Sequence, residues 1–194
     1  MNETHNHRSA LLLMDMQAPL VERLGSPELV SAVNRAAEAA RAAGVPVIYA
    51  RIAFRSGHPE ASPDNRIFTQ VAAAGGYVDG DESTTIHSDL APLDGDVVVT
   101  KRRVSAFAGS DLALVLESMG VKSLALAGLA TSGVVLSTLT EAADRDFRLT
   151  VLRDACADGD AELAEALLDR LFPRFADVVD VDDWCAGLNE KTGV

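Results

Sequence analysis

The strongest constraint on the fold is a series of short segments that are apolar throughout and alternate with helical patterns. An apolar run without polar alternation is typical of a strand buried on both faces, as in the parallel sheets of α/β proteins. Runs of this kind occur at residues 10–14, 46–50, 97–100, 123–127, 149–152 and 176–181. We therefore expect an α/β fold in which helices cover both faces of a parallel sheet, a three-layer α/β/α arrangement.

Helix start and stop signals lie between these runs. Ser26 and Pro27 open an alanine-rich segment that ends at Gly44, the expected order of N-cap, first helical residue and terminating glycine. The other helical patterns are 66–74, 110–119 capped by Ser110, 133–146, and 160–171 capped by Asp158 or Asp160. The alternation of strand and helix is thus regular along most of the chain.

Residues 52–95 depart from this rhythm. The segment contains several prolines and glycines, and only 66–74 has a helical pattern. A connection of this length in a compact domain is usually functional, a lid or an arm used in an oligomer. At 194 residues, the chain fits one domain over 1–194 with an excursion at 52–95.

Composition narrows the class of partner. The formal net charge is −12 and the isoelectric point is about 4.6, so no basic field is available for a nucleic-acid backbone. The first ten residues lack the pattern of a signal peptide, and no apolar run reaches the 18 or so residues of a membrane span. Cys156 and Cys185 are too few for a disulfide framework. We expect a cytoplasmic protein with a small-molecule substrate and neither nucleic-acid nor membrane partners.

The residues after each apolar run are the first candidates for a site, because ligands of open parallel sheets bind at the carboxyl ends of the strands. Asp15 follows the first run, Arg51 the second, Lys101 the third and Asp154 the fifth. The fourth run leads into GLATSG, residues 128–133, a turn of small residues that opens a helix. The N–H groups of such a turn suit an oxyanion or a carboxylate.

Asp15 and Lys101 are the most informative of these residues. A carboxylate directly after four large apolar residues is costly without a partner, and Lys101 is the nearest cation in the expected fold. The chain has few lysines beside many arginines, and a lysine kept next to Arg102 and Arg103 indicates a use for a compact ammonium. Each residue also has a plain alternative: Asp15 as a turn cap, Lys101 as a surface charge and Arg51 as part of a structural ion pair.

Other reactive side chains carry weaker signals. Ser132 does not lie in a Gly-x-Ser-x-Gly motif, and Cys156 is more typical of a buried, inert thiol. His58 and His87 lack the spacing of metal ligands, so no metal site is predicted.

The segments ALLLMDMQ, VVVTKRRVSAF and LALAGLATSGVVLSTLTEAADRDFRLTVLRDACAD resemble the isochorismatase-like hydrolase superfamily, which includes nicotinamidases and other cysteine hydrolases. The resemblance extends from about residue 9 to about residue 181. It implies a six-stranded parallel, Rossmann-like sheet, a cofactor-free hydrolytic site and a homo-oligomer, a dimer or higher.

The resemblance also implies site residues. Asp15 and Lys101 match the acid–base aspartate and its lysine, while the position of the catalytic cysteine is occupied by Val134. The Leu129–Ala130 bond is expected to be cis, and the N–H groups of Ala130 and Val134 are the expected oxyanion donors. The metal-binding Asp-x-His of nicotinamidases is absent, because the chain reads RIAFRSGHPE after the second run.

Three functions remain open. The first is hydrolysis without a thiol, as in isochorismatases, where a carboxyl group protonates an enol ether and water adds to the cation. The second is an amidase with a displaced nucleophile, Cys156 or Ser132. The third is a non-catalytic binding or assembly subunit, which the bulky Val134 favours. For the first, the expected pocket residues are Gln17, Arg51, Phe54, Phe107, Thr131 and Ser132.

Overall fold

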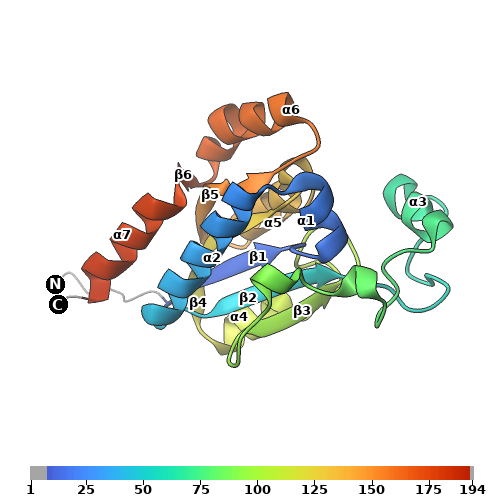
Figure 1. The fold of residues 1–194 in the computed structure, drawn as a ribbon, viewed down its shortest axis with the longest axis horizontal. Helices are drawn as coiled ribbons and strands as arrows, with labels where there is room; N and C mark the ends of the chain where they lie inside the picture. Colours follow the sequence, from blue (N-terminus) through green and yellow to red (C-terminus); the bar gives the residue numbers. More distant parts are fainter. Residues whose placement is uncertain (1–7, 193–194) are drawn as a thin grey trace.

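In the computed structural model, which describes residues 8–192, six parallel strands form one sheet between two layers of helices (Figure 1). The strands are β1 (Arg8–Met14), β2 (Val47–Ile52), β3 (Val97–Lys101), β4 (Val121–Leu129), β5 (Arg148–Ala157) and β6 (Asp177–Val179). Their order across the sheet is β3-β2-β1-β4-β5-β6. The direction of winding reverses between β1 and β4, which makes this the switch point of the sheet. The predicted three-layer α/β/α fold with six parallel strands is confirmed.

Strand β1 illustrates why the apolar runs lack polar alternation. Ala10, Leu12 and Met14 belong to the core on one face of the sheet, and Leu11 and Leu13 to the core on the other face. All five are fully buried. Because successive side chains of a strand point to opposite faces, a central strand covered on both sides is apolar at every position.

Two sets of helices cover these faces. The face that bears Leu11 and Leu13 is covered by α1 (Ala18–Leu24), α2 (Pro27–Ala42) and α7 (Val181–Thr192). The face that bears Ala10, Leu12 and Met14 is covered by α4 (Leu112–Ser118), α5 (Leu136–Asp144), and the short helices η4 (Leu167–Leu171) and η5 (Phe172–Arg174) that follow α6 (Ala161–Ala166). Within residues 8–192, no helix has the length and apolar character needed to cross a bilayer.

Two helix starts follow the predicted caps, whereas α4 begins at Leu112 with Asp111 rather than Ser110 at its N-cap position, although the Ser110 hydroxyl accepts from the Leu112 N–H (3.1 Å). Ser26 accepts a hydrogen bond from the Leu29 N–H (3.2 Å), and Asp160 accepts one from the Leu163 N–H (3.0 Å). Asp160 rather than Asp158 therefore caps α6. Helices α1 and α7 are not among the predicted elements. In α7, Val181, Trp184, Cys185 and Leu188 have helical spacing, which is the sequence signal for this helix.

The 52–95 segment forms an arm. It contains α3 (Arg66–Ala74) and two single-turn helices, η1 (Glu82–Thr84) and η2 (Ser88–Leu90). Helix α3 projects away from the sheet in Figure 1. It is held by a small apolar cluster in which Phe68 packs with Ile52 and Phe54 at the end of β2. The helix is capped by Asn65 and ends at Gly75 with φ 68°, a left-handed conformation that suits glycine.

Four strands extend beyond their predicted ends: β3 includes Lys101 and β4 includes Gly128 and Leu129. Asp154 and Cys156 lie inside β5 rather than beyond it, and Arg51 lies inside β2. Strand β5 extends because the register shifts after Leu126 and the strand then pairs again with β4, placing Cys156 opposite Gly128. The polar residues around Asp154 interrupt the apolar pattern, so the sequence does not predict the second half of this strand.

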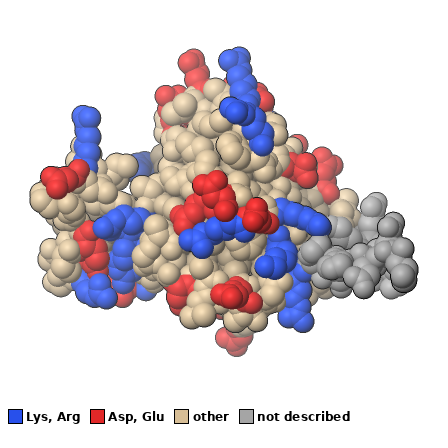
Figure 2. Space-filling view, turned by 180° about the vertical axis from the view of Figure 1, so that it is seen from behind, with Lys and Arg blue, Asp and Glu red and all other residues tan. Residues whose placement is uncertain are grey.

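The surface is acidic overall but not uniform. On the face turned away in Figure 1, lysines and arginines lie interspersed with aspartates and glutamates (Figure 2). This face therefore carries no continuous basic field of the kind that a nucleic-acid backbone requires.

Candidate active site

Asp15 lies at the carboxyl end of β1, next to the switch point of the sheet. Its N–H donates to the Ala50 carbonyl (2.8 Å), so the backbone is still tied to β2 at this residue. Its φ is 56°, in the left-handed region that few residues other than glycine adopt. Non-glycine residues in this region cost free energy and are concentrated at functional sites.

Lys101, the last residue of β3, reaches across β2 to Asp15. The Nζ atom lies 2.9 Å from Asp15 Oδ2, and the side chains of Lys101 and Asp15 are only 2% and 9% exposed. The ammonium also donates to the Arg103 carbonyl at 3.1 Å. The ion pair expected from the sequence is therefore present, and it is buried.

The carboxyl group of Asp15 has one oxygen still available. Burial raises the pKa of Asp15 above its ordinary value, against the opposing charge and hydrogen bond of Lys101. Within residues 8–192, Oδ1 is buried and has no hydrogen-bond partner. A carboxyl group whose pKa is raised and whose second oxygen is free is suited to take up or release a proton.

The turn after β4 begins next to the end of β1, where Gly128 pairs with Met14, the residue before Asp15. It runs through Ala130 into η3 (Thr131–Val135), a π-helical turn that continues into α5. The Leu129–Ala130 peptide is cis, as the sequence resemblance implies. Gly128 allows the turn to lie close to β1, because a Cβ atom there would be 2.9 Å from the Met14 carbonyl oxygen.

The two residues at the centre of the turn differ in chemistry. Val134 is 2% exposed and packs into the core. Its side chain is a hydrocarbon and has no nucleophilic atom. Thr131 is fully buried, and its hydroxyl has no hydrogen-bond partner within residues 8–192. The turn thus offers an unused hydroxyl but no thiol.

Ser132 and Cys156, the two alternative nucleophiles, are both poorly suited to attack a substrate: the first is hydrogen-bonded and the second is protonated. The Ser132 hydroxyl donates to Asp158 Oδ2 at 2.7 Å. Burial is the main reason that the pKa of Cys156 is raised to about 12, so this thiol stays protonated at neutral pH. Neither side chain makes a hydrogen bond to Asp15 in the described part of the chain.

Gln17 and Arg51 connect the arm to the sheet. The Gln17 amide donates to the carbonyls of Ile52 and Ser83, both at 3.0 Å, and accepts from the Ile52 N–H at 2.8 Å. Arg51 forms an ion pair with Asp79 at 2.8 Å. In residues 8–192, neither side chain forms an ion pair or hydrogen bond with Asp15 or Lys101.

The two predicted aromatic residues lie in different places. Phe54 is fully buried in the arm, where its ring meets that of Phe68 edge-on at 5.5 Å. Phe107 packs beside α5, with the Arg145 guanidinium 4.7 Å above its ring centre and the Phe147 ring at 6.1 Å. Their role in substrate binding stays a prediction.

Sequence reasoning missed Tyr77, which the arm brings to this edge. Tyr77 packs against both the α1–α2 side of the core and the arm cluster. Burial raises the pKa of Tyr77, the charge of Arg23 opposes this, and the charge of Asp15 adds to it, so the phenol lies within electrostatic range of both. The only signal in the sequence was an aromatic residue after two glycines.

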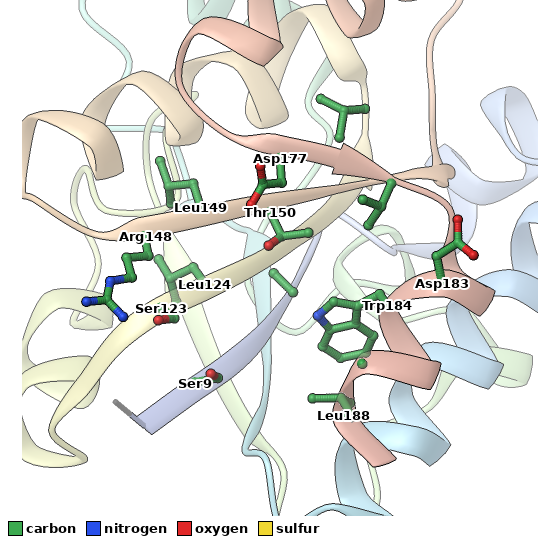
Figure 3. Close-up of a pocket in the computed structure, with 14 residues that line it drawn as sticks. Ser9, Ser123, Leu124, Arg148, Leu149, Thr150, Asp177, Asp183, Trp184 and Leu188 are labelled. Carbon is green, nitrogen blue, oxygen red and sulfur yellow. The ribbon is translucent and has the colours of Figure 1, made fainter. Parts of the chain in front are cut away.

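Two surface cavities lie away from the Asp15–Lys101 pair. One of about 610 Å³ is lined by the first residues of the strands, such as Ser9, Ser123 and Arg148, and by Trp184 of α7 (Figure 3). This is the opposite end of the sheet from Asp15. The other, of about 750 Å³, lies between α1, α2 and η2. Residues 8–192 contain no cluster of three or more His, Cys, Asp or Glu side chains that suits a metal ion.

Comparison with known proteins agrees with this geometry. The Isochorismatase domain model matches residues 9–183. The isochorismatase family protein YecD of Escherichia coli O157:H7 is 30% identical over 94% of this chain and 97% of its own length. The ureidoacrylate amidohydrolase RutB of Pseudomonas syringae is 32% identical over 91% and 82%.

A cysteine hydrolase from Pseudomonas syringae pv. phaseolicola has the same fold. It superposes with a TM-score of 0.86 at 24% identity, covering 94% of this chain and 93% of its own. The family match extends over most of the chain, including both members of the ion pair and the turn after β4. The chain therefore belongs to the isochorismatase family of hydrolases.

Proposed function

We propose that this protein hydrolyses a small molecule without a cofactor and without a thiol nucleophile, using the Asp15–Lys101 pair for proton transfer. The observation that carries the proposal is the buried pair itself, with one carboxylate oxygen free beside a turn that bears Val134 at the nucleophile position. A buried ion pair contributes little net stability, so its presence at a strand end favours a chemical role.

An amide-type substrate has the best support. The relative RutB is named as an amidohydrolase and is 32% identical to this chain. In the proposed reaction, water attacks the carbonyl carbon while Asp15 Oδ1 accepts its proton. The N–H groups of Ala130 and Val134 bind the resulting oxyanion. Asp15 then passes the proton to the leaving nitrogen as the C–N bond breaks, which yields an acid and an amine.

Lys101 has two tasks in this reaction. Its ammonium, 2.9 Å from Oδ2, opposes the rise in the pKa of Asp15 and thereby favours the ionised carboxylate that acts as the base. It also holds the carboxyl plane in place, so that Oδ1 and not Oδ2 points toward the reacting water. The Thr131 hydroxyl, which has no partner in the described residues, is available to orient that water or the substrate.

Hydrolysis of an enol ether is the second candidate. Burial favours the neutral form of Asp15, which is the form that protonates an enol carbon before water adds to the oxocarbenium ion. The two reactions need opposite protonation states of one residue, so the pH dependence of the rate separates them.

A hydrolysis panel tests the proposal. Simple esters, aromatic amides and vinyl ethers are supplied to the wild type and to Asp15→Asn, each with and without prior thiol alkylation. We expect turnover that survives alkylation and falls by about 10²–10⁴-fold in Asp15→Asn, the usual contribution of a general acid or base. Loss of turnover on alkylation would move the assignment to Cys156. Tight ligand binding without turnover would favour a non-catalytic subunit.

A further inference from the structure

We propose that Asp158 is a positioning residue for this hydrolysis: its carboxylate holds Ser132 and thereby fixes the turn that presents the Ala130 and Val134 N–H groups. The inference rests on the proposed function, because it concerns the same turn. It assigns a role to a residue on the loop between β5 and α6 that forms no hydrogen bond or ion pair with Asp15 or Lys101 within residues 8–192.

The contacts are short and converge on one atom. Both the N–H and the hydroxyl of Ser132 donate to Asp158 Oδ2, each at 2.7 Å. The other oxygen, Oδ1, accepts from the Asp160 N–H at 3.2 Å. One carboxylate therefore joins two loops that are 26 residues apart in the sequence.

The hydrogen bonds inside the turn involve residues other than the Ser132 N–H, and the Leu136 N–H, for example, donates to the carbonyls of Thr131 and Gly133. The Ala130 carbonyl accepts from the N–H groups of Gly133 and Val135, at 3.1 and 3.3 Å. Ser132 lies between Ala130 and Gly133 in the turn. Its N–H points out of the turn and donates to Asp158 instead. The first helical turn is thus fastened from outside the helix, next to both proposed oxyanion donors.

Positioning of this kind has a large effect on rate. Oxyanion donors act only when they lie about 2.7–3.1 Å from the developing charge, and a misplacement of about 1 Å can cost 10²-fold. If Ser132 were released, the turn would be free to move the Val134 N–H by that amount while the overall fold persisted.

The charge of Asp158 makes the direction of the effect informative. Burial by itself would raise the pKa of Asp158, but hydrogen bonds from Ser132, Asp160 and Gly159 outweigh it and hold the pKa below its ordinary value. The group is therefore ionised at neutral pH. A negative charge near an oxyanion is unfavourable, so charge alone predicts that Asp158→Asn speeds the reaction, whereas positioning predicts that it slows it.

The same loop supplies a control. Asp160 caps α6 by accepting from the Leu163 N–H at 3.0 Å, and within residues 8–192 its side chain makes no hydrogen bond to the turn. Asp160→Ala removes a cap, which costs about 1 kcal/mol in a typical helix. It therefore reproduces a loss of stability in this loop without releasing Ser132.

Steady-state kinetics on the substrate found by the panel test the inference. We expect kcat to fall about 10- to 100-fold in Asp158→Asn with KM changed by less than about threefold, as for a lost transition-state contact. Ser132→Val should lower kcat. Ser132→Thr has nearly the same shape as the valine variant but retains the hydroxyl, so it should keep most of the wild-type kcat. Asp160→Ala should keep the wild-type kcat. An unchanged or raised kcat in Asp158→Asn overturns the inference.

Amide hydrogen exchange provides a second readout that does not need turnover. The Ser132 N–H should exchange at least about tenfold faster in Asp158→Asn, and at the wild-type rate in Asp160→Ala. Faster exchange with an unchanged kcat would make Asp158 a structural cap only and overturn its positioning role. A wild type that is inactive across the panel overturns the proposed function, and this inference with it, whatever the exchange shows.

Discussion

Asp15 and Lys101 each carry a charge into the interior, and each is tolerable there only because of the other. Their side chains are 9% and 2% exposed and meet at 2.9 Å. Breaking a buried pair leaves an uncompensated charge, whereas replacing both partners by apolar residues is often neutral for stability. Stability and activity should therefore respond differently to single and double substitutions.

We expect Lys101→Met to lower the free energy of unfolding by about 3 kcal/mol at pH 7, because Asp15 loses its partner. The double variant Asp15→Leu/Lys101→Met should recover most of that loss while having no turnover. Urea unfolding of the wild type, both single variants and the double variant gives the coupling energy. A single substitution that costs nothing would show that the pair is not buried in solution.

The pH dependence of kcat/KM identifies the working form of Asp15. Because burial raises its pKa, protonation should occur above the ordinary value of about 3.9. As a base in amide hydrolysis, Asp15 is active when ionised, so the rate should rise with pH through the raised pKa and then level off. As an acid in enol-ether hydrolysis, it is active when protonated, so the rate should fall over the same range. An amide-hydrolysis rate that is already maximal at pH 4 would contradict the base assignment.

Val134→Cys tests the assignment of the nucleophile position. A thiol at this helix start should have a lowered pKa and react with small alkylating reagents. We also expect amidase activity to appear or increase, since the acyl-transfer route becomes available. Mass spectrometry identifies the labelled residue, with buried Cys156 as the internal comparison. Failure of residue 134 to react would mean that the turn is wrongly aligned with the cysteine hydrolases.

At the scale of elements, the site depends on how closely the end of β4 approaches β1. Gly128 lies opposite Met14 in the register, one residue before Asp15. Any side chain at this position would separate the two strand ends at the point where the turn and the carboxyl meet. Gly133, four residues after the cis-bonded Leu129, has no such restriction.

Gly128→Ala should therefore be destabilising and Gly133→Ala should not. The added Cβ at position 128 would be 2.9 Å from the Met14 carbonyl oxygen and 3.2 Å from a methyl group of Val135. Overpacking of this kind costs about 1–3 kcal/mol. At position 133, the nearest heavy atom is 3.9 Å away, so an alanine fits. Thermal unfolding of the two variants, together with turnover, provides the comparison; equal melting temperatures would contradict the close approach.

The arm is held at the same edge by the residues after Lys101. Arg102 lies 3.4 Å from Glu60, and the Arg103 guanidinium lies 5.6 Å above the Phe68 ring centre. The three consecutive cations thus have three different partners: the Asp15 carboxyl, the base of the arm and α3. This explains why the sequence carries KRR at the end of β3.

At the scale of the whole molecule, the arm is the part that packs least against the sheet and its helices. Helix α3 projects from the body and leaves Ile67 58% exposed (Figure 1). From the sequence resemblance, we expect a homo-oligomer, a dimer or higher. Sedimentation equilibrium should give a mass at least twice the 20.4 kDa of one chain. A mass of one chain at all concentrations up to about 100 μM would contradict this, because stable oligomers form well below that level.

The sequence by itself determined the layers and pointed to the Asp15–Lys101 ion pair. Six apolar runs predicted the strands because residues buried on both faces have to be apolar, and that requirement is local. Asp15 could be singled out because a carboxylate directly after such a run needs a cation. The family resemblance supplied Val134 and the cis bond, which no periodicity indicates.

Only the tertiary structure decided the contacts that support the pair. The extension of β5 through Cys156 depends on a register shift against β4, and the contact of Ser132 with Asp158 joins loops 26 residues apart. Tyr77 reaches this edge of the sheet because the arm pairs with the chain just after β2, where the Phe54 N–H donates to the Tyr77 carbonyl (2.7 Å). These contacts arise from the packing of distant segments, which local hydrophobic patterns do not encode, since one sequence pattern is compatible with several registers and loop paths.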